Sequence, residues 1–188
     1  RIGSQILTHY PETMEIAKTI TAQEAIADQN RACAVHIPDF AREVLEQIGF
    51  EARKSEYVDV KSGVSARLSI SAYENLLSTA ELRMLTSGGT QTNIRLSDFM
   101  GIIPAINGKV ELVYEGEQEG PYNVALFLFS GAIKKLFLET FDHPDEAQKK
   151  MDKDPYGTLR AWFGAGNEID VLTEMTQKDY ESALSEVP

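Results

Sequence analysis

The chain has 188 residues, a net charge of −11 and a pI near 4.7. This acidic balance argues against nonspecific nucleic-acid binding, which needs a basic surface, and no apolar run approaches the length of a membrane span. Hydrophobic residues make up 43% of the chain, enough for one core, and the single cysteine, Cys33, excludes an internal disulfide. We therefore expect a cytoplasmic protein that binds neither nucleic acid nor membrane.

The first residues predict a short strand followed by helices. Residues 1–11 read as one extended segment closed by Pro11, and a lone strand needs either helices to pack on or partner strands. Residues 12–26 predict a helix, which the capping-box pattern Thr21-Ala22-Gln23-Glu24 would restart. Residues 28–36 give a mixed pattern without a clear prediction.

Pro38 suits the first position of a second helix, and Gly49 is expected to end or loosen it. The apolar residues at helical spacing are Phe40, Val44, Leu45, Ile48 and Ala52.

A third helix follows the turn at Gly63. Ser65 is its expected N-cap, which makes Ala66 and Arg67 its first residues, and Ser87-Gly88-Gly89 is its expected stop. Its apolar face would comprise Ile70, Tyr73, Leu77, Ala80 and Met84. A cation such as Arg67 faces the positive end of the helix dipole, so either an anion binds there or Arg67 is a plain surface residue.

After a loop at residues 90–93, a helix is expected to start in Arg95-Leu96-Ser97-Asp98-Phe99, with Ser97 as its cap. It would continue to Val113 with kinks at Pro104 and Gly108, and a strand at residues 109–114 is the alternative. The acidic residues 115–120 predict a turn.

Pro121 opens a segment that is apolar nearly all round as far as Phe141, so it predicts the central and most buried helix. Residues 142–154 predict a solvated short helix or linker. Leu159, Trp162 and Phe163 form an apolar group that would dock the tail on the body, and residues 176–184 predict a capped helix.

No complete enzyme site is visible in the sequence. The chain lacks the GxxxxGK[ST] loop of nucleotide hydrolases, and Gly164-Ala165-Gly166 reads as a turn rather than a dinucleotide loop. None of the three histidines lies at metal-ligand spacing, so no metal site is expected. The acids at residues 111–119 fit a solvated turn better than a catalytic pair.

Three segments, in order, carry a family resemblance. Residues 1–11 resemble the end of an ATPase core, with an arginine-finger motif, a last strand and a Tyr-Pro pair. Gly63-Val64-Ser65-Ala66-Arg67 resembles a Gly-x-Ser-x-Arg that opens a lid helix, and Arg95-Leu96-Ser97-Asp98-Phe99 resembles the start of the next lid helix. Together they make residues 1 to about 115 similar to the C-terminal part of an AAA+ ATPase of the magnesium-chelatase I-subunit and MoxR group.

The resemblance implies a mainly α fold, a helical-bundle lid domain with one short N-terminal strand and a helical C-terminal extension. The implied boundaries are 1–20 for the end of the core and linker, 21–141 for the lid and 142–188 for the extension. Arg67 would be the sensor-2 arginine that reaches the γ-phosphate of ATP, with Ser65 beside it, and Arg1 would match the arginine finger. Such arginines neutralise charge on a transferring phosphoryl group.

The implied partners are the upstream ATPase core, neighbouring subunits of a ring and, as in many relatives, a von Willebrand A-domain protein. The implied cofactor is ATP with Mg²⁺ in a full-length parent, with none bound to this chain, because the family's phosphate loop and Mg²⁺-binding acid lie upstream. The chain alone is therefore expected not to hydrolyse ATP. The rival interpretation is a stand-alone acidic helical adaptor that binds a protein partner.

Overall fold

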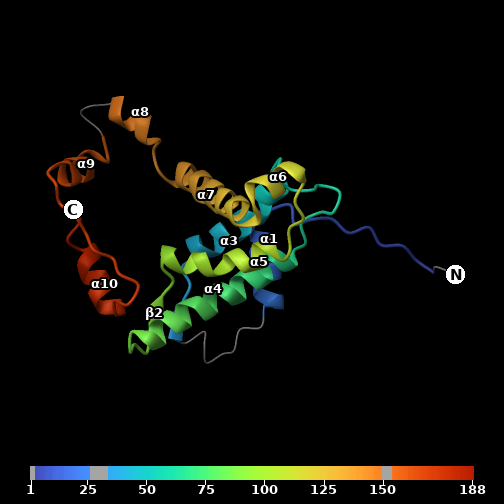
Figure 1. Ribbon diagram of the computed structural model, residues 1–188, viewed down its shortest axis with the longest axis horizontal. Coiled ribbons are helices and arrows are strands. Elements are labelled where there is room, and N and C mark those ends of the chain that lie inside the picture. The colour runs from blue at the N-terminus through green and yellow to red at the C-terminus, as the bar shows by residue number, and fades with distance from the viewer. Residues whose placement is uncertain (1–2, 26–33, 150–153) are drawn as a thin grey trace.

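The structure is a computed structural model that describes residues 3–25, 34–149 and 154–188 (Figure 1). Within these ranges it is mainly helical, with one small parallel sheet of two strands. The α-helices are α1 (Met14–Glu24), α3 (Asp39–Ala52), α4 (Arg67–Thr86), α5 (Ile103–Asn107), α6 (Tyr114–Glu119), α7 (Pro121–Thr140), α8 (Pro144–Lys149), α9 (Gly157–Gly164) and α10 (Gln177–Leu184). A 3-10 helix, η1 (Leu96–Ile102), precedes α5, and the strands are β1 (Val35–His36) and β2 (Thr92–Asn93).

The core lies between α3, α4, α5 and α7, which Figure 1 shows stacked in the centre of the molecule. The predicted face of α4 is buried except for Ile70, which is half-buried. Stacked rings of Phe99 and Phe129, with centroids 5.2 Å apart, join η1 to α7. The largest fully buried apolar side chains are Leu45, Ile48, Leu68, Leu76, Ile102, Ile106, Val64 and Val124.

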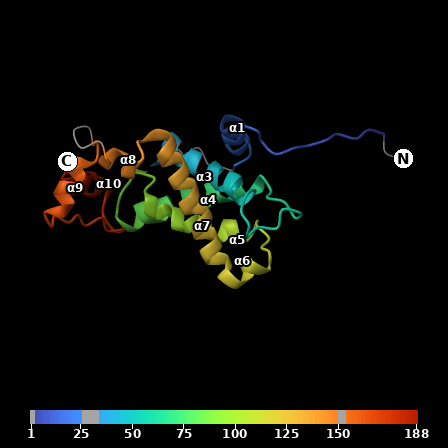
Figure 2. The same ribbon diagram turned by 90° about the horizontal axis from the view of Figure 1, so that it is seen from above.

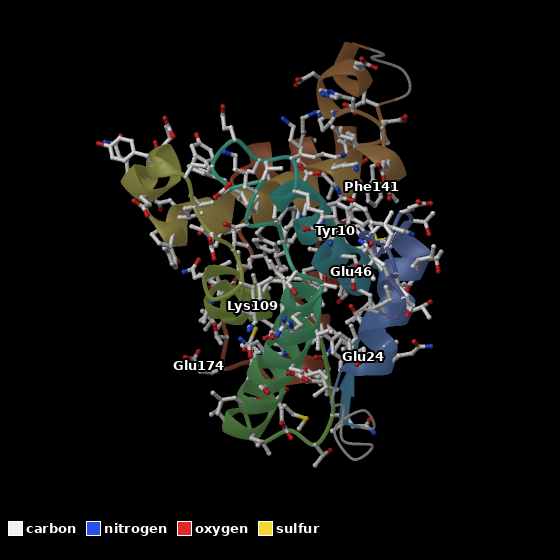
Figure 3. All side chains as sticks on the ribbon, turned by 90° about the vertical axis from the view of Figure 1, so that its right-hand side faces the viewer. Tyr10, Glu24, Glu46, Lys109, Phe141 and Glu174 are labelled. Carbon is white, nitrogen blue, oxygen red and sulfur yellow. The ribbon has the colours of Figure 1, made fainter. Side chains whose placement is uncertain are left out.

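Helix α1 packs on α3 through a buried polar contact. The Thr21 hydroxyl donates to the Glu46 carboxylate at 2.5 Å, and both side chains are buried. Glu46 lies on the side of α3 that faces α1 in Figure 3. The predicted capping box at Thr21 is wrong, because Thr21 lies inside α1 and its hydroxyl donates to Glu46. The helix is capped instead by Thr13, which accepts from the backbone N–H of Ile16 at 3.3 Å.

Helix α3 confirms the predicted buried positions except one. Phe40, in the first turn, is 42% exposed. Pro38 is the N-cap rather than the first helical residue, and Gly49 neither ends nor loosens the helix, which runs on to Ala52.

The parallel pair β1–β2 was not predicted. Val35 pairs with Thr92 and His36 with Asn93, and the N–H of Ile94 extends the ladder to the His36 carbonyl at 3.0 Å. The expected loop at residues 90–93 is therefore wrong in its last two residues. Strands of two residues are too short to display the alternation from which a strand is recognised.

The segment from residue 95 to residue 120 departs most from expectation. Arg95, not Ser97, caps the helix, which starts as η1 and ends with α5 at Gly108 instead of kinking and running to Val113. The alternative strand at residues 109–114 is reduced to one isolated bridge, from Val58 to Leu112. The expected acidic turn is helix α6, whose first-turn acids suit the helix dipole.

Helix α7 has the predicted bounds but is not buried on all sides. Tyr122, Phe127 and Leu138 are 56%, 50% and 40% exposed, so α7 leaves large apolar side chains uncovered within the described chain. Pro121 and the long apolar run account for where α7 begins and for its length. They do not determine how much of its surface other helices cover.

The C-terminal helices lie at one end of the molecule and residues 3–9 at the other, as Figures 1 and 2 both show. Of the two alternatives for residues 142–154, the short helix is present as α8, and the helix predicted at residues 176–184 is present as α10. The predicted docking group in α9 is wrong, because no residue of α9 is buried and Phe163 is 49% exposed. Among the described helices, none combines the length and apolar character of a membrane span.

The expected N-terminal strand is also absent from the described part. Residues 3–11 are extended but pair with no described strand, and Ile6 and Leu7 are 84% and 89% exposed. A strand gains its stability from its neighbours, and the described chain offers this segment none.

Candidate functional site

Two of the three resembling segments touch at the start of α4. The Tyr10 hydroxyl accepts a hydrogen bond from the backbone N–H of Val64 at 3.0 Å. It can approach because Gly63 has no Cβ and adopts φ +74°, a left-handed conformation that favours glycine. The Tyr-Pro end of the extended segment is thereby fixed to the turn that precedes Ser65.

The ring of Tyr10 also covers a half-buried cation. The Arg53 guanidinium lies over it at 4.4 Å from the ring centroid, and over the Phe50 ring at 5.2 Å. Burial lowers the pKa of Arg53, and the nearby Tyr10 and Glu46 oppose that shift. Tyr10 is therefore held by its hydroxyl on one side and its face on the other (Figure 3).

The predicted cap is one residue off, because α4 begins at Arg67 with Ala66 as its N-cap, and Ser65 precedes that cap. The Ser65 hydroxyl oxygen accepts from the N–H of Arg67 at 3.2 Å, and its carbonyl accepts from the N–H of Leu68 at 2.9 Å. Arg67 is exposed, and it has no side-chain partner among the described residues. Its guanidinium is therefore free to bind an incoming anion at the positive end of a 20-residue helix.

The third resembling segment contains a buried ionic centre. Arg83 on α4 binds Asp98 through two parallel hydrogen bonds, Nε to Oδ1 at 2.7 Å and Nη2 to Oδ2 at 2.9 Å, and both residues are buried. The same guanidinium donates to the Thr92 hydroxyl at 3.0 Å and the Asn93 carbonyl at 2.8 Å. Asp98 also accepts from the backbone N–H of Arg95 at 2.8 Å, so it fixes the start of η1.

The side chain of Arg95 points the other way, to the C-terminal segment. Its Nη2 donates to the carbonyl of Met175 at 3.0 Å and that of Thr176 at 3.2 Å, and its guanidinium lies 4.0 Å from the ring centroid of Tyr180. Burial lowers the pKa of Arg95, and the neighbouring charge of Arg83 lowers it further. Tyr180, Asp98 and Glu181 act in the opposite direction.

The predicted site residues do not form one cluster. Arg67 begins α4 and Arg83 lies near its end, about 24 Å away at a rise of about 1.5 Å per residue. The predicted finger, Arg1, lies outside the described residues. A cavity of about 610 Å³ lined by Glu56, Tyr57, Glu115, Gln118 and Glu119 is acidic and so unsuited to a phosphate. No group of metal ligands occurs in the described ranges.

Sequence reasoning missed Arg83 as the partner of Asp98 and Arg95 as the anchor of α10. The sequence held one usable signal, an acid three residues after Arg95, which is the spacing of a capping box. Nothing in the sequence marked Arg83, because its position on α4 reads as an ordinary last-turn cation.

The sequence and structure were compared with known proteins. No protein-family model, no curated protein and no solved structure matches this chain.

Proposed function

We propose that this chain is the lid of an AAA+ ATPase of the magnesium-chelatase I-subunit and MoxR type, and that Arg67 is its sensor for the γ-phosphate of ATP. The observation that carries the proposal is the exposed guanidinium of Arg67 at the N-terminus of α4, which has no partner within the described part of the chain and whose backbone N–H is held by the Ser65 hydroxyl. An arginine there opposes the helix dipole by about 0.3–1 kcal/mol, which an incoming phosphate would turn into a favourable arrangement.

Two further observations support the proposal. Tyr10 ties the first resembling segment to the second, so a movement of residues 3–9 would be transmitted to the turn that positions Arg67. The third segment starts a helix, as the resemblance implies, and its Asp98 binds α4 through Arg83. The body that carries Arg67 is thus one packed unit from α3 to α7.

On this proposal the chain would contribute only the side chains of Arg67 and Ser65 to ATP hydrolysis. ATP and Mg²⁺ would be held mainly by a core with a phosphate loop, and no GxxxxGK[ST] sequence occurs among these 188 residues. Arg67 would neutralise charge on the transferring phosphoryl group, and Ser65 would hold the first turn in place. On this proposal the purified chain alone shows no ATP turnover.

The test is made in the longer chain that the proposal requires, one in which a phosphate loop precedes these residues. Arg67→Ala is expected to lower ATP turnover at least tenfold, and Arg67→Lys to restore only part of it, because lysine lacks the planar fork of donors. Arg160→Ala, at another exposed arginine, is the matched control and should retain full turnover. Unchanged turnover in Arg67→Ala would contradict the proposal, as would turnover by the present chain alone.

The second candidate is an acidic helical adaptor, favoured by the exposed aromatic side chains of Tyr122, Phe127 and Phe141 on and after α7. A coding sequence that begins close to Arg1 would support the adaptor. A GxxxxGK[ST] motif upstream in the same reading frame would support the ATPase lid.

A further inference from the structure

The surface that holds α10 has more hydrogen-bonding capacity than α10 uses. We call Thr92, Asn93 and Arg95 the tail-binding surface. Arg95 is only 4% exposed, yet its Nε and Nη1 have no partner among the described residues. A buried donor without an acceptor costs free energy, so the present occupant satisfies this surface incompletely. A ligand with a carboxylate aimed at Arg95 would satisfy it better.

The charges around this surface favour an acidic ligand. Arg83 and Arg95 bring two buried cations, and Asp98 supplies one buried anion. The second anion comes from the tail itself, since the Glu181 carboxylate accepts from the Asn93 amide at 3.4 Å. Without α10 the surface would carry an uncompensated positive charge in a protein whose net charge is −11.

The contacts of the tail come from one short segment. The Gln177 side-chain oxygen accepts from the Thr92 hydroxyl at 3.0 Å and from the Asn93 backbone N–H at 3.2 Å. Two carbonyls just before Gln177 bind Arg95, and the ring of Tyr180 stacks on it. A short run of residues that combines backbone carbonyls with a few side-chain anchors is the pattern of peptide recognition.

We propose that the tail-binding surface is an exchangeable peptide site, which residues 175–181 cover in cis and which an acidic peptide segment of a partner protein occupies in trans. The trans segment has the same chemistry: two free carbonyls, a side-chain acceptor for β2, an aromatic ring for Arg95 and a carboxylate. The site is independent of the proposed nucleotide role, because it uses neither Arg67 nor ATP. The tethered tail acts as a built-in competitor at an effective concentration on the order of millimolar.

The test uses the full chain and a fluorescently labelled peptide of residues 172–188, which carries four acids and one lysine, with binding followed by anisotropy. Tyr180→Ala in the chain, but not in the peptide, weakens the competitor. We expect it to raise the apparent affinity for the peptide about tenfold, as the loss of one desolvated cation–π contact implies. Tyr122→Ala removes an exposed tyrosine on α7 and is expected to leave the affinity unchanged.

Two further measurements show whether Arg95 is the anchor. A peptide with Tyr180→Ala should bind the Tyr180→Ala chain about tenfold more weakly than the native peptide, without any change to the protein's folding. Adding Arg95→Lys to that chain should also weaken binding, because lysine lacks the fork and the stacking plane. The proposal is overturned if the native peptide fails to bind the Tyr180→Ala chain, or if both peptides bind it equally well.

Discussion

The Tyr10 hydroxyl lies 2.5 Å from the position that a Cβ on Gly63 would occupy. That hydroxyl also accepts the hydrogen bond from the backbone N–H of Val64. It can occupy this position only because residue 63 is a glycine without a Cβ. The attachment of the N-terminal segment and the backbone conformation at residue 63 are therefore coupled.

This coupling predicts that Gly63→Ala is more destabilising than backbone strain alone explains. Gly88→Ala is the matched control, because Gly88 has φ +72° and no atom within 4 Å of its Cβ position. We expect the control to lose about 1 kcal/mol of unfolding free energy and Gly63→Ala about 1 kcal/mol more, measured by urea titration. Hydrogen exchange at the Val64 amide should accelerate in Gly63→Ala only. Equal losses in the two variants would contradict the coupling.

The Arg83–Asp98 pair predicts a large penalty for removing one partner. Asp98→Ala leaves a buried guanidinium without its carboxylate and removes the acceptor for the Arg95 N–H. The expected loss of unfolding free energy is about 3–5 kcal/mol, measured by thermal or urea unfolding.

The control for that loss is Asp145→Ala, at a carboxylate 86% exposed, which should change stability by less than about 0.5 kcal/mol. Replacing both members of the buried pair with leucine should cost less than Asp98→Ala alone, since no guanidinium is then left at residue 83 without its carboxylate. A small effect of Asp98→Ala would show that the pair is not held as described.

Replacing Arg67 is expected to have opposite effects on the stability of the chain and on the proposed ATPase activity. In the present chain, Arg67→Glu places an anion at the positive end of α4 and should raise the unfolding free energy by about 0.3–1 kcal/mol at low salt. Lys134→Glu makes the same change of charge at an exposed site in the middle of α7, where the dipole is weak, and should give no gain. A loss of stability in Arg67→Glu at low salt would mean that the arginine has a structural partner.

The starts of several helices could be predicted from local sequence signals. Pro121 and Thr176 start α7 and α10 where the sequence places them, because caps and first-turn prolines act within a few residues of chain. Helix α4 begins one residue later than predicted, with Ala66 as its N-cap. The turn predicted for the acidic residues 115–120 is wrong, because residues 114–119 form helix α6. In the structure Gly116 is needed because any Cβ would overlap the carbonyl oxygen of Tyr57.

The long-range polar contacts could not have been derived from the sequence. Arg83 and Asp98 meet across two elements, and Arg95 meets residues 175 and 176 from the far end of the chain. Hydrophobic periodicity reports which face of a helix is buried, but it does not say which polar residues share that burial. Of the predicted site, Arg67 begins α4 and Ser65 lies just before its N-cap, and their role with nucleotide stays a prediction.

The parallel pair β1–β2 bears on the order in which the protein folds. Val35 and Thr92 are far apart in the chain and the ladder is two residues long, so closing it gains little until α3 and α4 have already met. Because β2 supplies Thr92 and Asn93 to the C-terminal segment, that segment can be captured only after this late step. We expect refolding followed at the tail to lag behind refolding followed in the core.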